Sequence, residues 1–407
     1  MSVTSRRWRL RRSARSKALF GLGLILILTI GRPAFSSALT FNVTRTDDPS
    51  PGHCLVGDCS LREAVIDGNN NPGSIINLPS GSYYLTRSGL DESSYYGDLD
   101  ITGSVTIIGI YATINAGSLS PRERAFHVLG GATLSMSGVT VTGGSEGLDY
   151  GGGIFIQNGG ADLYNCTLAG NSAMYGGGIY NQGRLVINNC TLYGNTATTS
   201  GGGFYNSGVA NLTNSTISGN GAVSGNGGGL LNYTGVIGLS FVTVAQNSVN
   251  ITNGGGGGIY NAGGTVYLDD TLIVGNTGRE PDVSGAMASS GYNLVYNSYG
   301  GWGFTPLDRL NPASSVAGII APLAGNGGPT LTHALVYTSP AIDAGSPNFT
   351  PPSNYDQRGY GYPRVRNNRV DIGAYEYQSD DGGESTGAKI QISVNSEGGC
   401  GVSASKK

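Results

Sequence analysis

Six stretches of the chain align without gaps around one reference position, and every aligned column holds one kind of residue. Apolar residues stand five and three positions before the reference and two positions after it. Five positions after it stands an asparagine, except in the first stretch, which has a glycine there. A repeat of this length buries its apolar face only against copies of itself, so a solenoid is predicted. The reference residues, which follow one another at intervals of 24 to 29 positions, are Val139, Cys166, Cys190, Ser215, Val242 and Thr271.

The aligned segments are typical of strands. They are short and rich in β-branched residues, and apolar residues stand two apart, as at Leu185 and Ile187. The chain also holds 70 glycines, and a glycine inside a helix costs about 1 kcal/mol, whereas a sharp corner between strands favours it. We therefore predict an all-β fold, a right-handed single-stranded parallel β-helix. The glycine clusters that would form its corners begin at Gly151, Gly176, Gly201, Gly227 and Gly254.

An asparagine follows four of these glycine clusters, and two roles are expected for it. Asparagine tolerates left-handed corner conformations. Amides stacked on neighbouring coils can also hydrogen-bond to one another along the solenoid axis. The four residues are Asn181, Asn206, Asn232 and Asn261.

The first 38 residues differ in composition from the rest. A basic segment precedes an apolar run over residues 18–30, which is followed by Ser36, Ser37 and Ala38. This order predicts a secretory signal peptide over residues 1–38, through the general or the twin-arginine route. The segment holds eight of the 23 basic residues and no acid, so the exported chain would carry 15 basic and 26 acidic residues. Nucleic acid is not expected as a partner of so acidic a chain, and no transmembrane helix is expected in it.

Composition divides the remaining chain into four predicted parts. The first is an N-terminal cap, in which Ser60 and Glu63 have the spacing of a capping box and begin a short helix that stops at Gly68. Regular coils follow, then a proline-rich segment of irregular coils folding over the far end, then a flexible tail. The four parts span residues 39–74, 75–277, 278–377 and 378–407.

The five cysteines are expected to comprise one disulfide pair, two buried free thiols and one cysteine without a partner. Cys54 and Cys59 are separated by a short glycine-containing loop, which makes them a disulfide candidate in an exported chain. Cys166 and Cys190 share the reference column, so both are predicted to point inward from neighbouring coils as buried free thiols. Cys400 has no predicted partner.

Charged side chains are almost absent from the regular coils. Between residues 151 and 268 the charged residues are Asp162 and Arg184, and no histidine occurs. Glycan hydrolysis needs a pair of carboxylates, and β-elimination needs a base with a cation or an arginine. The coils are therefore predicted to carry no catalytic site, cofactor or metal, and the two charges are interpreted as an exposed ion pair.

Charge gathers instead near the two ends of the chain. Asp91, Glu92, Asp98 and Asp100 form an acidic cluster that Ca²⁺ could bind, but no calcium-loop spacing is present, so solvated charges are the favoured interpretation. Three histidines are too scattered in the sequence to predict a metal site or a catalytic group. They are His53, His127 and His333.

The C-terminal charges allow two interpretations. They could line a glycan cleft, or the arginines could pair with carboxylates and loop carbonyls to fix irregular backbone, which is the favoured interpretation. The residues of this alternative glycan site are Asp356, Arg358, Arg364, Asp371 and Glu376.

Three tyrosines follow the glycine clusters at equivalent positions and predict an aromatic stripe on one outer face. Such rings can bind sugars or a protein partner. Stacking of one coil on the next, without any ligand, is the favoured interpretation. The stripe consists of Tyr180, Tyr205 and Tyr260.

Two terminal motifs resemble known families. Cys59-Ser60-Leu61-Arg62-Glu63-Ala64 is similar to the motif of the CSLREA domain, and residues 356–359 and 371–376 resemble the end of the choice-of-anchor Q domain. The glycine-rich coils resemble repeats of chlamydial polymorphic outer-membrane proteins. Residues 398–401 are similar to a cysteine-bearing sorting signal, although no hydrophobic segment follows them. The resemblance implies an exported bacterial β-helix at the cell surface or outer membrane.

These observations favour an exported structural or adhesive protein that is not an enzyme and needs no cofactor. Glycans and cell-surface proteins are the partners that its neutral surface would suit. The alternative is a protein that binds or cleaves polysaccharide at the C-terminal charged residues, as a lyase or a glycoside hydrolase would.

Overall fold

The computed structural model of this chain describes residues 38–378 apart from 90, 120, 121, 251, 253 and 350–353, and the backbone of two short strands beyond them. The chain divides into the units Met1–Ser37 and Ala38–Lys407, and the second is described below. The predicted signal peptide lies outside the described residues except for Ala38. Among the described residues no helix is both long and apolar enough to cross a membrane.

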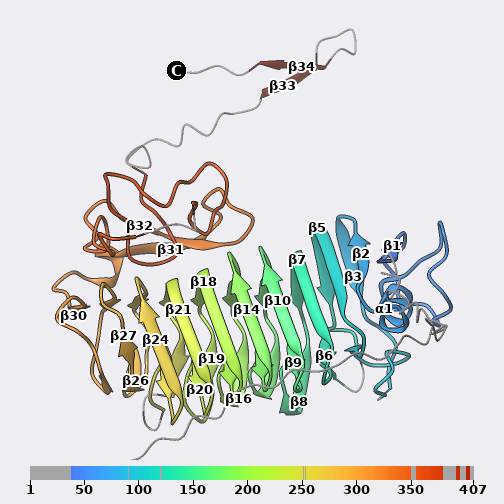
Figure 1. Cartoon of the computed structure of the whole chain (residues 1–407), viewed down its shortest axis with the longest axis horizontal. Helices are drawn as coiled ribbons and strands as arrows, with labels where there is room; N and C mark the ends of the chain where they lie inside the picture. Colours follow the sequence, from blue (N-terminus) through green and yellow to red (C-terminus); the bar gives the residue numbers. More distant parts are fainter. Residues whose placement is uncertain are drawn as a thin grey trace, which may run out of the picture. The chain divides into compact units, whose positions relative to one another are not determined.

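Residues 40–310 form a right-handed parallel β-helix, as predicted (Figure 1). Three sheets run along it, and each strand pairs with its counterpart on the next coil. The largest sheet contains β1 (Thr40–Asn42), β2 (Ser74–Leu78), β3 (Gly81–Tyr84), β5 (Val105–Asn115), β7 (Thr133–Thr142), β10 (Gly160–Tyr164), β11 (Thr167–Ala169), β14 (Arg184–Asn188), β15 (Thr191–Tyr193), β18 (Val209–Ser218), β21 (Val236–Ala245), β24 (Thr265–Asp269), β25 (Leu272–Val274), β27 (Ala288–Ser289), β28 (Leu294–Val295) and β30 (Arg309–Leu310).

The two other sheets are built from shorter strands. One contains β8 (Ser145–Tyr150), β12 (Ser172–Tyr175), β16 (Thr196–Ser200), β19 (Gly221–Ala222) and β22 (Ser248–Val249). The other contains β4 (Leu99–Ile101), β6 (Phe126–Val128), β9 (Ile154–Ile156), β13 (Ile179–Asn181), β17 (Phe204–Asn206), β20 (Leu230–Asn232), β23 (Ile259–Asn261), β26 (Val283–Ala286) and β29 (Gly301–Trp302).

The observed register confirms the alignment of the six stretches. Ala161 pairs with Leu134 on the preceding coil and with Leu185 on the following one, and all three side chains are buried. Cys166 and Cys190 of the reference column are buried free thiols, also as predicted. Because each apolar column is repeated coil after coil, the core is one continuous cluster along the axis.

The corners differ in part from the prediction. In four clusters the first glycine has positive φ, as at Gly176 (66°), and in the five-glycine run it is Gly256. The two glycines after it lie against backbone carbonyls of the neighbouring coil, where a side chain has no room. The asparagines that are left-handed on successive coils are instead those directly before the reference column. They are Asn165, Asn189 and Asn214, with φ of 52°, 54° and 47°. The prediction of left-handed corners at Asn181 and its counterparts is wrong.

Two buried asparagine ladders hold the coils in register. The predicted ladder has Asn181 donating to Asn206, Asn206 to Asn232 and Asn232 to Asn261, at 2.8 to 3.1 Å. A second ladder follows the asparagine column of the alignment and ends on a carboxylate, because its last amide donates to Asp282 Oδ1 at 2.7 Å. Its members are Asn171, Asn195, Asn220, Asn247 and Asn276.

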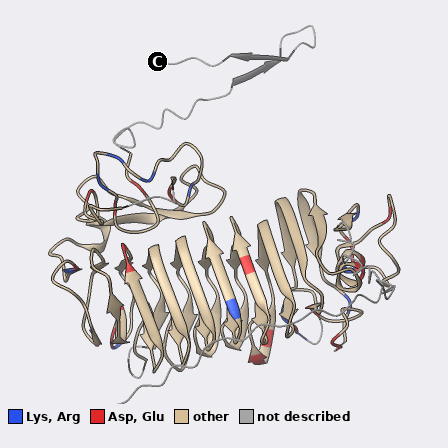
Figure 2. Ribbon diagram, viewed as in Figure 1, with Lys and Arg blue, Asp and Glu red and all other residues tan. Residues whose placement is uncertain are grey.

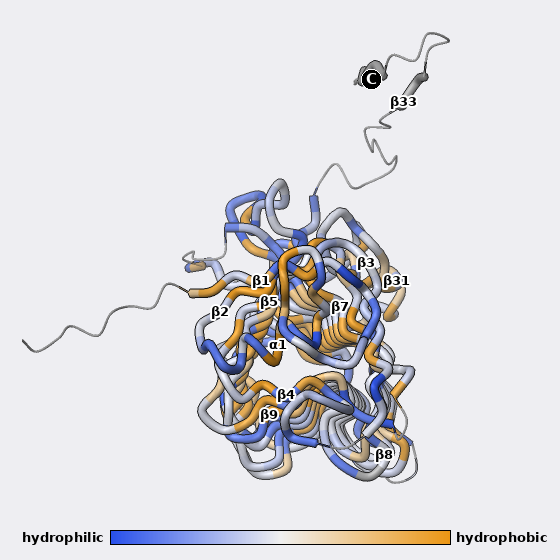
Figure 3. The backbone as a smooth tube through the Cα atoms, turned by 90° about the vertical axis from the view of Figure 1, so that its right-hand side faces the viewer, coloured by the Kyte–Doolittle hydropathy of each residue, from blue (hydrophilic) through white to orange (hydrophobic). Residues whose placement is uncertain are grey.

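The N-terminal end of the solenoid is covered by α1 (Leu61–Asn70), which lies across the first coils (Figure 3). The capping box is confirmed: Ser60 Oγ accepts from the backbone N of Glu63, and Glu63 Oε2 accepts from that of Ser60. Leu61 and Val65 pack into the core. The helix runs two residues beyond the predicted stop at Gly68, and it covers the backbone edge that a solenoid would otherwise expose.

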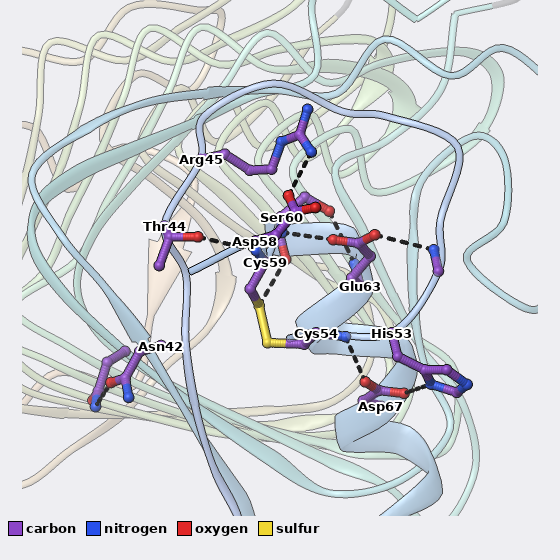
Figure 4. The surroundings of a disulfide bond; sticks show 12 residues. Asn42, Thr44, Arg45, His53, Cys54, Asp58, Cys59, Ser60, Glu63 and Asp67 are labelled. Carbon is purple, nitrogen blue, oxygen red and sulfur yellow. Dashed lines mark hydrogen bonds and ion pairs between the residues drawn. A yellow bond between two sulfur atoms is a disulfide. The ribbon is translucent and has the colours of Figure 1, made fainter. Parts of the chain in front are cut away.

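The disulfide between Cys54 and Cys59 is confirmed and ties the preceding loop to the start of α1 (Figure 4). Asp67 on α1 fixes the same loop, since its Oδ2 accepts from the backbone N of Cys54 at 2.8 Å and its Oδ1 lies 2.9 Å from Nδ1 of His53. The cap is therefore held by one covalent bond and several polar ones.

The C-terminal segment departs from the prediction in two ways. Parallel coils continue through β30 and do not stop at residue 277. The following segment then packs on the flank of the solenoid and not over its far end (Figure 1). It includes the 3₁₀ helix η1 (Val316–Gly318) and an antiparallel pair, β31 (Ile320–Ala324) and β32 (Thr332–Leu335).

One column of outward-facing threonines explains where this segment packs. Thr140 and Thr167 are partly exposed, whereas Thr191, Thr216 and Thr243 at the same position on later coils are buried beneath the segment. All three donate to or accept from it, and apolar side chains complete the contact. Of the predicted tail, the structure describes only β33 (Gln391–Val394) and β34 (Cys400–Ser403), which pair antiparallel.

Candidate functional site

One column of outward-facing side chains changes from polar to aromatic along the chain. It lies on the sheet that contains β4, β6, β9, β13, β17, β20 and β23. Side chains alternate along a strand, so the middle residue of each of these three-residue strands points away from the core. Register pairs place these middle residues directly above one another on successive coils. In chain order the column reads Asp100, His127, Phe155, Tyr180, Tyr205, Leu231 and Tyr260.

A cleft of about 590 Å³ lies at the polar end of this column, and we call it the charged cleft. Acidic side chains outnumber basic ones around it, and Figure 2 shows acidic residues on β8 at its border. The loop that carries part of the lining is held by Arg62 of α1, whose guanidinium is buried and donates to the carbonyls of Ser94 and Gly97 at 2.9 Å. The cleft is lined by Asp91, Glu92, Asp98, Arg122, Glu123, Arg124, His127, Glu146, Asp149, Phe155 and Gln157.

Arg124 is the central cation of the charged cleft. Its guanidinium donates to Asp149 Oδ2 at 3.1 Å, lies 3.7 Å from a carboxylate oxygen of Asp98, and stands 5.2 Å from the ring centre of Phe155. Burial raises the pKa of Asp98 well above its usual value, and burial also raises the pKa of Glu123 to about 7. The cleft therefore combines a fixed positive charge with carboxyl groups that hold protons more firmly than in water.

One prediction about these residues is wrong. Asp98 and Asp100 are not solvated loop charges, because both side chains are buried, Asp100 at 0% exposure. The scattered histidine positions do not place His127 beside them, but its Nδ1 lies 3.2 Å from Glu92 Oε2 and 3.6 Å from Asp100 Oδ1. Asp100 and His127 could have been found from the sequence, since both occupy the middle of a short strand in equivalent coils, but Glu92 reaches them from a loop.

Two of the three tyrosines of the predicted stripe form a stack, and Leu231 separates the third, Tyr260, from them. The rings of Tyr180 and Tyr205 are nearly parallel, at 10°, with centres 4.7 Å apart, and the two residues are 7% and 8% exposed. Stacking between coils, the favoured interpretation, is thus present. Other tyrosines flank the stack, and together they border a hollow of about 550 Å³, which we call the tyrosine groove. It is lined by Tyr150, Tyr175, Tyr180, Thr199, Ser200, Tyr205, Asn226, Leu231, Tyr233, Tyr260 and Ala262.

The C-terminal charged residues do not form an open cleft, so the alternative glycan site is wrong at this position. Asp356, Arg358, Arg364, Asp371 and Glu376 are all buried. Arg358 donates to both carboxylate oxygens of Asp356 and to the carbonyl of Glu376. Arg364 donates to two backbone carbonyls of the segment, and burial raises the pKa of Glu376 to about 9. These charges fix irregular backbone.

The same segment is anchored to the coils by polar contacts from its core. Gln357 Nε2 donates to the carbonyl of Cys190 at 3.1 Å, and its Oε1 accepts from Thr216 Oγ1 at 2.6 Å. Arg364 also donates to the side chain of Asn214, a left-handed corner of β18. On the open flank, Arg184 and Asp162 form the ion pair predicted for neighbouring coils, at 2.6 Å.

The fold defines a parallel β-helix protein with two hollows on one outer face. No family model and no curated protein matches this chain. A solved structure described as "Crystal structure of pectate lyase Pel9A" is similar to it, with 15% identity and a TM-score of 0.42, covering 84% of this chain and 98% of that one. A likeness of this degree carries no argument about activity.

Proposed function

We propose that this chain is an exported polysaccharide-binding protein that holds a neutral glycan in the tyrosine groove without cleaving it. The tyrosine groove is the observation that carries the proposal. Aromatic rings recur there from coil to coil, at the spacing of about 4.8 Å between stacked strands. A groove that repeats along an axis suits a polymer that repeats along its length. Tyr180 and Tyr205 cover each other's ring faces, so the apolar ring surface and hydroxyls for a sugar would come mainly from the less buried Tyr150, Tyr175 and Tyr233.

The charges around the groove favour a neutral ligand. Thr199, Ser200 and Asn226 supply its polar atoms, and its lining contains no charged side chain or histidine among the described residues. The adjoining charged cleft is rich in carboxylates, which would repel an acidic glycan. Binding without turnover follows for the groove, because glycan cleavage needs carboxylates or a base at the bond that breaks.

Glycan cleavage is a second candidate, and it would take place in the charged cleft. Glu123 has a pKa raised to about 7 by burial, which suits a general acid, and Arg124 could stabilise developing negative charge beside it. A chain bound along the tyrosine groove would have to extend into the cleft to reach them.

The proposed binding is tested with insoluble and soluble neutral polysaccharides and with oligosaccharides by calorimetry. Tyr233 lines the groove and is 53% exposed, so Tyr233→Ala should weaken binding without disturbing the fold. Loss of one aromatic contact worth about 1 kcal/mol should raise the dissociation constant roughly fivefold. Tyr267→Ala is the matched control, since Tyr267 is 51% exposed but lies on β24 of another sheet.

Absence of binding to every neutral glycan, or equal effects of the two variants, would refute the groove as a binding site. Release of shortened or unsaturated products by the wild type, and its loss in Glu123→Gln, would show that the function is cleavage and not binding alone.

Export and surface location are supported by the composition of residues 1–38 and by the terminal motifs. Fractionation of cells that express the chain with and without residues 378–407 tests both.

A further inference from the structure

Three side chains from separate parts of the N-terminal region meet at one point of the charged cleft. Asp100 on β4 and His127 on β6 are register partners on neighbouring coils, and Glu92 approaches from the loop before β4. One ligand atom from each lies within 4.8 Å of the other two. Their spacing is therefore that of a metal site, although His127 follows Asp100 by 27 residues in the sequence.

We propose that Glu92, Asp100 and His127 bind a divalent cation of the zinc class, with a remaining position open to the charged cleft. Zinc bound at about 2.1 Å in a tetrahedral site places its ligand atoms about 3.4 Å apart. The two measured separations from His127 Nδ1 are 3.2 Å to Glu92 Oε2 and 3.6 Å to Asp100 Oδ1. One nitrogen and two carboxylate oxygens form a donor set that zinc accepts, whereas Ca²⁺ prefers oxygen ligands alone.

The carboxylate of Asp100 provides an independent reason for a ligand. Its Oδ2 accepts from the backbone N of Ser94 at 2.9 Å, but its Oδ1 is buried without a hydrogen-bond partner and faces His127. A buried carboxylate oxygen without a donor is costly, and a cation at this point would satisfy it.

The surroundings of His127 fit a metal ligand. Its Nε2 lies 2.9 Å from Gln157 Oε1, which can only accept, so the proton is assigned to Nε2 and Nδ1 is left as the lone-pair donor. The ring lies 4.9 Å from that of Phe155 and is inclined to it by only 7°, which fixes its orientation. The side chain of Glu92 is 70% exposed, so the cation could enter from the cleft.

The competing explanation is that His127 is protonated and simply pairs with the two carboxylates, and metal titration separates the two. The mature chain, prepared without a polyhistidine tag and treated with chelator, is titrated with ZnCl₂ and with CaCl₂ by calorimetry. We expect one zinc per chain. Glu92→Gln should weaken zinc binding at least tenfold, and His127→Phe, which keeps the ring on Phe155, should weaken it at least a hundredfold.

Asp91→Asn is the matched control, because it removes a neighbouring carboxylate whose Oδ1 already accepts from the backbone N of Ser93. Its zinc affinity should stay within about threefold of the wild type, since only a long-range charge is lost. The melting temperature should rise with zinc in the wild type and in Asp91→Asn but not in His127→Phe. The proposal is overturned by absence of zinc binding at 100-fold excess over about 1 μM protein, by unchanged binding in both ligand variants, or by calcium binding without zinc binding.

Discussion

Replacement of Asn220 tests how strongly the second asparagine ladder stabilises the coils. The side chain is fully buried, and its amide takes part in four hydrogen bonds of 2.9 to 3.0 Å. Two come from the backbone N and the side chain of Asn195, and two go to Leu192 O and Asn247 Oδ1. At about 1 kcal/mol net for each bond, Asn220→Ala should lower the free energy of unfolding by about 4 kcal/mol.

A second variant separates hydrogen bonding from shape. Asn220→Asp keeps the outline of the side chain but turns a carboxylate oxygen toward two acceptors, so it should also destabilise, and more at pH 7 than at pH 4. Asn211→Ala is the matched control, since this residue lies on the same strand, β18, with its side chain exposed. It should change the free energy of unfolding by less than about 0.5 kcal/mol.

Urea unfolding followed by circular dichroism and tyrosine fluorescence gives the midpoint and slope for each variant. If Asn220→Ala falls within about 0.5 kcal/mol of Asn211→Ala, the ladder does not stabilise the coils and the reasoning fails. A changed slope would instead show that the coils no longer unfold together.

Three further predictions concern a glycine, the buried acids and the disulfide. Gly177→Ala places a side chain against carbonyl oxygens of the neighbouring coil and should lower the free energy of unfolding by at least about 3 kcal/mol. Gly194→Ala has positive φ but open space around the new side chain, so it should lower this free energy by only about 1 kcal/mol. Thermal melts of the two variants measure the difference. Burial raises the pKa of Asp282 and Asp371 to about 6 and of Asp270 to about 7, so the folded state binds protons that the unfolded state has lost. The stability that these raised pKa values contribute is complete below about pH 4 and is lost as the pH rises through 6 to 7. The urea midpoint should therefore be lower at pH 8 than at pH 5. An unchanged midpoint would contradict the raised pKa values. Cys54→Ala combined with Cys59→Ala should cost about 2 kcal/mol for so short a loop, measured against the oxidised chain in the same melt, and no loss would mean that α1 is held by its polar contacts alone.

The N-terminal motif shows how far local sequence can be interpreted. Ser60 and Glu63 signal a helix start by their spacing alone, because capping depends on backbone groups within one turn. Arg62, between them, carries no such signal, and yet its buried guanidinium fixes the loop at Ser94 and Gly97 that forms the charged cleft. That contact spans more than 30 residues, and no local pattern encodes it.

The candidate site was only partly predictable for the same reason. The tyrosine stripe could be found because its members repeat with the coil. The groove beside it was missed, although Tyr150 and Tyr175 are register partners that both stand directly before a glycine cluster, whereas Tyr233 has no such repeated position. The C-terminal charges could be read either as a cleft or as buried pairs. Burial alone decided between the two, as it does for Asp356 and Arg358.

The sequence by itself determined the solenoid, its strand register and one of its two amide ladders, because a repeat places the same residue at the same height on every coil and each coil contacts only its neighbours. Only the tertiary structure decided where chemistry gathers. The C-terminal segment covers Thr191, Thr216 and Thr243 on the flank, and a loop brings Glu92 to Asp100 and His127. Both contacts join a loop or irregular segment to the regular strands, and such contacts depend on shape and burial that no periodic pattern records.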